Sequence, residues 1–118
     1  ISDQAARLLE EGGEPDKAVR ALMDAARRQG ARGDQRGSTE RYGRAFALAL
    51  AKASLPPDVI LELGLATGRA ALPSLDLPLA EQALLRAVAE ADAADNARAG
   101  AEARILLSRV HARQARMD

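Results

Sequence analysis

Three predicted helices of this chain begin at nearly regular intervals, and this recurrence limits the folds that the chain can adopt. They start after Pro15, after Pro57 and after Asn96, which lie about forty residues apart. Such a period is typical of proteins that stack one small helical unit on the next. Because six short amphipathic helices fill the 118 residues, the sequence predicts an all-α fold, an α-α superhelix of stacked helical hairpins.

Local signals predict the bounds of the second and third helices. The second helix begins at Pro15, since proline is tolerated in a first helical turn. Residues 30–37 contain three glycines, which end this helix and predict a flexible connector. Ser38 is a good N-cap for the third helix, in which Tyr42 and Phe46 follow the spacing of a buried face.

The fourth helix, predicted over residues 58–72, is apolar almost all the way round. This pattern is expected of a helix that is covered on two sides, so Leu63 is predicted to be fully buried. Gly64 and Gly68 have the spacing of a membrane dimer motif, but charged residues flank them within a short helix. The pair therefore favours close helix packing over membrane association.

Short connections pair the second helix with the third and the fourth with the fifth. The predicted repeats cover approximately residues 15–54, 56–93 and 95–118 of one helical-repeat domain, residues 1–118, and Asp95 or Asn96 caps the last helix. The third repeat lacks its second helix. We therefore expect the chain to be part of a longer protein, an expectation that fits a first residue other than methionine.

Composition excludes several classes of function. The 17 basic residues balance the 17 acidic ones, without a basic or acidic segment, so the electrostatic signature of a nucleic-acid-binding domain is absent. The chain has no cysteine, which excludes disulfides, thiolate nucleophiles and cysteine-based zinc sites. No apolar run has membrane-spanning length, and the chain start does not resemble a signal peptide. These features predict a cytoplasmic protein without membrane contact.

The sequence offers no constellation of catalytic residues. The single histidine, His111, has no second histidine at metal-ligand spacing, and no serine lies in a nucleophile-elbow motif. A solvated or packed His111 is the favoured interpretation. We therefore predict no catalytic residue, no metal and no cofactor, and a binding module rather than an enzyme.

Charged residues recur at equivalent positions in the first helices of the three hairpins. These residues are Arg20, Arg27, Glu62, Arg69, Glu102 and Arg109. If the helices stack, Arg27, Arg69 and Arg109 form a row that could bind a carboxylate or phosphate of a protein partner or a small anionic effector. The alternative is a polar stripe that keeps this face soluble.

The last helix carries a second arginine pattern. Its basic residues are predicted to share one side, where a membrane-surface or nucleic-acid role is the alternative to a solvated face: Arg104, Arg109, Arg113 and Arg116. Because aromatic residues are absent from this helix and Glu102 lies nearby, the solvated face is favoured and direct contact with nucleic acid is not expected.

Two stretches resemble known helical repeats. The junction AEADAADNARAGAE, with small residues at Ala83 and Ala87, is similar to the junction between tetratricopeptide repeats. A longer pattern, AARLLEEGGEPDKAVRALMDAARR, RYGRAFALALAKASLPPDVILELGLA and LAEQALLRAVAEA, resembles the sensor region of large ATP-binding transcriptional regulators of the LuxR type. These belong to the maltose-activator-like group that is common in GC-rich actinobacteria.

The resemblance implies a parent protein with three parts. A nucleotide-switch ATPase would precede an effector-sensing, self-associating repeat region, and a helix-turn-helix would follow it. The chain has no GxxxxGK[ST] loop, so ATP binding is not assigned to it. Two alternatives stay open, a stand-alone scaffold for protein assembly and a helical regulator that binds DNA directly.

Overall fold

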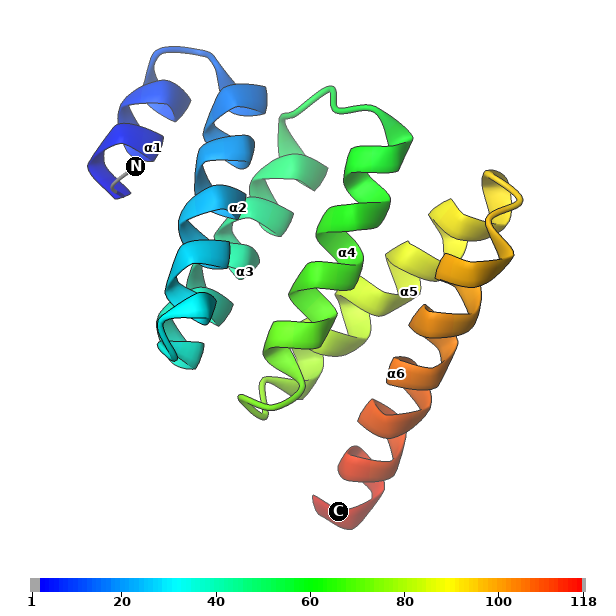
Figure 1. The fold of residues 1–118 in the computed structure, drawn as a ribbon. Coiled ribbons are helices and arrows are strands. Elements are labelled where there is room, and N and C mark those ends of the chain that lie inside the picture. Colours follow the sequence, from blue (N-terminus) through cyan, green and yellow to red (C-terminus); the bar gives the residue numbers. More distant parts are fainter. Residues whose placement is uncertain (1–2, 118) are drawn as a thin grey trace. The chain divides into compact units, whose positions relative to one another are not determined.

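The computed structural model of this protein consists of six α-helices and no strand in the part of the chain that it describes (Figure 1). This part is residues 3–117, with the side chains at positions 3, 8 and 10 left out. The helices are α1 (Asp3–Glu11), α2 (Pro15–Ala31), α3 (Gln35–Ala51), α4 (Pro57–Ala71), α5 (Leu77–Ala93) and α6 (Ala97–Met117). The prediction of an all-α fold with six helices is confirmed.

The chain divides into two compact units. The first ends at Pro56 and contains α1, α2 and α3, and the second begins at Pro57 and contains α4, α5 and α6. The boundary lies at the two adjacent prolines that separate the first two predicted repeats. A proline disfavours helical conformation in the residue before it, so neither helix continues through this point.

In the first unit, α1 packs on α2, and α2 pairs with α3 in a helical hairpin (Figure 1). The core contains Val19, Leu22 and Phe46, all of which are buried. A buried hydrogen bond also joins the two helices of the hairpin, because the Ser38 hydroxyl donates to the Ala26 carbonyl over 2.8 Å. Ser38 thus cross-links α2 and α3.

This role of Ser38 corrects the predicted start of the third helix. Helix α3 begins at Gln35, within the predicted connector, and Asp34 is its N-cap: a side-chain oxygen of Asp34 accepts from the Gly37 amide over 2.9 Å. Gly37 lies so close to the Asp34 side chain that a β-carbon would overlap it. A glycine that indicated a loop therefore belongs to the first turn of the helix.

In the second unit, α4 and α5 form the other predicted hairpin, and α6 packs on α5 (Figure 1). The glycine pair of α4 makes a close helix contact: a β-carbon on Gly64 would lie 2.9 Å from the Ala83 carbonyl oxygen, and one on Gly68 would overlap Leu84. Close packing of these glycines is confirmed. Leu63 is fully buried, as predicted.

Four of the turns between helices share one closing hydrogen bond. The amide that donates is five residues after the carbonyl that accepts it: Glu14 to Leu9, Asp34 to Gln29, Asp76 to Ala71 and Asn96 to Ala91. This is the long bond of a Schellman motif, which places the preceding residue in the left-handed region. Those residues are Gly13, Gly33, Leu75 and Asp95. Asn96 then caps α6, because its side-chain oxygen accepts from the Ala99 amide.

Candidate functional site

The predicted arginine row is divided between the two units. Arg27 lies on α2 of the first unit, where it is exposed and pairs with Asp24 over 3.6 Å, and Arg20 is exposed on the same helix. Arg69 and Arg109 belong to α4 and α6 of the second unit. A row of all three arginines therefore stays a prediction. Arg69 and Arg109 lie in the same unit, so their positions can be compared.

Arg69 reaches from α4 to α6, where its guanidinium binds the Glu102 carboxylate. The Nε–Oε2 distance is 2.6 Å, and Nη2 contacts the same oxygen. The exposed fractions of the two side chains are 52% and 40%, so the pair is worth at most about 1 kcal/mol of stability. The predicted residues Arg69 and Glu102 thus come together across two helices, while Glu62 is exposed on α4.

Arg109 follows Glu102 by two helical turns, so both residues lie on nearly the same side of α6. Arg109 lines a pocket of about 380 Å³ with the residues that follow α4 and with two further arginines of α6. The complete lining is Leu72, Pro73, Arg109, Ala112, Arg113 and Arg116. Positions 109, 113 and 116 share one helix face because they are four and three residues apart. This arginine pocket is the candidate functional site.

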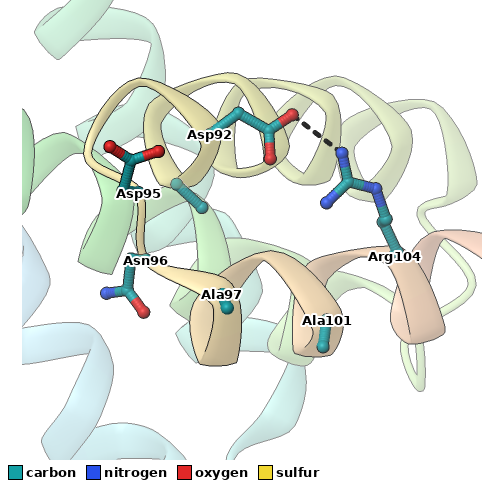
Figure 2. A pocket seen from close by; sticks show the side chains of 7 residues that line it. Asp92, Asp95, Asn96, Ala97, Ala101 and Arg104 are labelled. Carbon is teal, nitrogen blue, oxygen red and sulfur yellow. Dashed lines mark hydrogen bonds and ion pairs between the residues drawn. The ribbon is translucent and has the colours of Figure 1, made fainter.

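Arg104 does not belong to that face, so the prediction that four arginines share one side of the helix is wrong for this residue. Figure 2 shows Arg104 on α6 directed at Asp92 on α5, with 2.7 Å between Nη2 and Oδ2. The hydrogen bond to Asp92, followed by the charge of Asp92, raises the pKa of Arg104 above its ordinary value. Arg104 and Arg109 are five positions apart, which turns them to different sides of the helix.

Asp92 and Arg104 line another pocket, of about 580 Å³, at the turn between α5 and α6 (Figure 2). Its polar residues already have structural roles: Asp92 and Arg104 neutralise each other, Asn96 caps α6, and Asp95 is the left-handed residue of the turn. Because the charges of Asp92 and Arg104 cancel, the remaining charge of the lining is the exposed carboxylate of Asp95, which does not favour an anion.

The first unit has a basic pocket of its own, of about 400 Å³, lined in part by Arg28 and Arg41. Two of its three arginines bind neighbouring side chains of the same unit, and the third, Arg32, is exposed at the end of α2. Arg28 pairs with Asp24 over 2.9 Å, and Arg41 donates to Gln29, which in turn donates to Asp34. The arginine pocket of the second unit differs because its lining contains no carboxylate or amide side chain.

His111 lies on α6, where its Nε2 is 2.9 Å from the Glu81 carboxylate of α5. The His111 side chain is 54% exposed and bound to this one carboxylate. Within residues 3–117, no three histidine, cysteine or acidic side chains gather in a group that could hold a metal ion. None of the helices in that part of the chain is long and apolar enough to cross a membrane.

In comparisons with known proteins, no family model matches this chain, and neither a curated protein nor a solved structure shows significant similarity to it. The resemblance to tetratricopeptide repeats and to LuxR-type sensor regions therefore stays a prediction. The candidate site rests on the geometry of the second unit alone.

Only the helical part of the arginine pocket could be predicted from the sequence. Spacing along α6 groups Arg109, Arg113 and Arg116, and that signal was present in the sequence. The apolar floor, Leu72 and Pro73, comes from the connection after α4 and has no spacing relation to α6. Only the packing of the second unit brings the two segments together.

Proposed function

We propose that this chain is a non-catalytic binding module built of tetratricopeptide-like helical hairpins. In this proposal it is the sensor region of a LuxR-type transcriptional regulator, binds an anionic effector or a protein partner, and mediates self-association. Two hairpins of similar length support the repeat architecture. The resemblance of the sequence supports the assignment to a regulator.

The observation that carries the binding function is the group of arginines where α4 and α6 adjoin. Arg69 contacts Glu102 there, and Arg109 lies two turns further along the same side of α6. Exposed guanidinium groups on neighbouring helices create positive potential that favours a carboxylate or a phosphate. This surface is the proposed site for the effector or the partner.

The proposed self-association involves the outer stripe of α6. Ala101 and Ile105 are exposed along it one turn apart, and the exposed fraction of Ile105 is 54%. Pairing of this stripe with the same stripe of a second copy would cover apolar side chains that otherwise contact water. The proposed occupant of the stripe is thus a second copy of this chain.

Sedimentation velocity over a range of protein concentrations tests the self-association. We expect a concentration-dependent dimer, and we expect Ile105→Glu to abolish it because a charge would be placed in the apolar contact. Leu85→Glu is the matched control, since Leu85 is similarly exposed but lies on α5. A chain that stays monomeric at all concentrations would contradict this part of the proposal.

The regulator assignment has a separate test, which is the sequence of the gene on both sides of this segment. We expect a nucleotide-switch ATPase before it and a helix-turn-helix after it. A gene with neither part favours the stand-alone scaffold. Retention of the chain on DNA that falls steeply with salt would instead favour the helical DNA-binding regulator.

A further inference from the structure

The three arginines of the arginine pocket lie together on one face of α6 without an acidic side chain in the pocket lining. Several other cations have a carboxylate partner: Lys17 with Glu14, Arg28 with Asp24, Arg69 with Glu102, Arg86 with Glu90 and Arg104 with Asp92. Within the described residues, Arg109, Arg113 and Arg116 form no ion pair, although they share one face of α6. The pocket therefore combines three positive charges without a compensating acid.

Such an arrangement opposes folding when nothing else is bound, because like charges three or four residues apart on a helix repel each other. The helix dipole offsets part of this repulsion, since Arg116 lies in the last turn of α6. Stabilisation by the helix dipole, however, does not explain why the arginines line a concave site. Here the arginines line one side of a pocket of about 380 Å³ whose remaining lining, Leu72, Pro73 and Ala112, is apolar.

We propose that this pocket binds a phosphate monoester. Its phosphate would contact Arg109, Arg113 and Arg116, and its organic part would lie on Leu72 and Pro73. This inference rests on the proposed function, because it specifies the anionic effector of the same surface.

The number of arginines favours phosphate over carboxylate. A monocarboxylate has a single negative charge and two acceptor oxygens, which one guanidinium can already engage in a bidentate contact, so it compensates three arginines poorly. A phosphate monoester has three acceptor oxygens and a charge near −2 at neutral pH, which suits several guanidinium groups at once. The apolar part of the lining distinguishes an ester from free phosphate.

Calorimetric titration of the full chain with phenyl phosphate and with inorganic phosphate tests the proposal. We expect phenyl phosphate to bind more tightly than inorganic phosphate, and Arg113→Gln to weaken phenyl phosphate about tenfold or more through the loss of a charge-assisted hydrogen bond. The matched control is Arg98→Gln, which removes the same charge from the first turn of α6, outside the pocket. This control is expected to bind phenyl phosphate as the unmodified chain does.

A second variant tests the apolar part of the site. Pro73 is exposed and follows the end of α4, so Pro73→Ser changes the floor of the pocket without removing a buried side chain. We expect it to lower the affinity for phenyl phosphate toward that for inorganic phosphate and to leave inorganic phosphate binding unchanged. Circular dichroism of each variant confirms that the helices are retained.

Three outcomes overturn the proposal. The first is that phenyl phosphate does not bind at millimolar concentrations, and the second is that Arg98→Gln and Arg113→Gln weaken it equally, as general charge attraction would. The third is that a short DNA duplex, but not phenyl phosphate, binds in a manner that depends on Arg113. If binding of an anionic ligand depended on Arg69 but not on Arg113, this pocket would not be the binding site, although the proposed binding function would stand.

Discussion

The two units of this protein differ in the residues that take the left-handed conformation in their turns. In the first unit, Gly13 and Gly33 are the left-handed residues of the turns, with φ of +78° and +88°. In the second unit, Leu75 and Asp95 take that conformation, with φ of +60° and +52°. Two glycines of the second unit, Gly64 and Gly68, instead lie inside α4, against α5. The first unit thus has relaxed turns, whereas the second has strained turns and a closer helix contact.

This difference shows that the same turn geometry does not require the same residue. The Schellman hydrogen bond closes all four turns, so a non-glycine residue is held in the left-handed region by the helices on either side of it. For an L-residue with a β-carbon this conformation costs about 1–2 kcal/mol. Glycine at these turn positions would therefore stabilise the second unit, whereas the first unit already has glycine there.

The largest expected effect is common to both units, because each has a leucine that is almost completely buried. Leu63→Ala in α4 and Leu22→Ala in α2 should each lower the free energy of unfolding by about 2–5 kcal/mol, through lost burial and the cavity left behind. Chemical denaturation followed by circular dichroism measures both. An unchanged denaturation midpoint for Leu63→Ala would remove α4 from the core of its unit.

The helix contacts should respond differently in the two units. Gly64→Ala places a β-carbon 2.9 Å from the Ala83 carbonyl oxygen, so α4 and α5 must separate and stability should fall by about 1–3 kcal/mol. Gly30→Ala is the matched change in α2, where the nearest atom is the Ser38 hydroxyl oxygen at 3.2 Å. The higher helix propensity of alanine offsets that contact, which keeps the change within about 1 kcal/mol of zero.

Thermal denaturation of these two variants decides whether close packing is confined to the second unit. Equal losses of stability in Gly64→Ala and Gly30→Ala would mean that the two hairpins pack equally tightly. The difference in glycine use would then have no consequence for packing.

Substitutions at the left-handed positions of the turns should change the free energy of unfolding in opposite directions in the two units. Leu75→Gly should raise the free energy of unfolding by about 1 kcal/mol, because glycine adopts a positive φ without the steric cost of a β-carbon. Gly33→Ala should lower it by a similar amount, about 1 kcal/mol, for the converse reason. Urea denaturation measures both, and a destabilising Leu75→Gly would show that the second unit's turns are not strained.

The smallest expected effect concerns the exposed ion pair of the second unit. Arg69→Ala should change stability by less than about 0.5 kcal/mol, because both Arg69 and Glu102 are substantially exposed and neither charge would be left buried. The melting temperature of this variant, measured beside that of the unmodified chain, checks it. A loss comparable to that of Gly64→Ala would give this pair a structural role instead.

The helices could be predicted from the sequence because the three-then-four spacing of apolar residues identifies a buried helix face. The start of α3 could not. Asp34 and Gly37 indicated a loop, whereas in the structure Asp34 caps the helix at Gly37. The hydroxyl of Ser38, the predicted cap, donates to α2 instead. Which of the two residues caps α3 depends on this tertiary contact, and no local sequence pattern indicates it.

The candidate site was predictable to a similar extent. The spacing of Arg109, Arg113 and Arg116 indicated a basic face, and the recurrence of Arg69 and Glu102 selected residues that come together across α4 and α6. The spacing of Arg104 from Arg109 already turns it to another side of the helix, whereas its contact with Asp92 depends on the packing of α6 on α5 and could not be predicted from the sequence.

The central claim is that the second unit binds an anionic ligand in its arginine pocket and that the basic pocket of the first unit does not. NMR spectra of the arginine side chains, recorded during a titration with phenyl phosphate, test this most directly. We expect the Nε–H signals of Arg109, Arg113 and Arg116 to shift together and to saturate. The chemical shifts of Arg28 and Arg41 should not change. Shifts of equal size at the arginines of both units, or none at Arg113, would contradict the central claim.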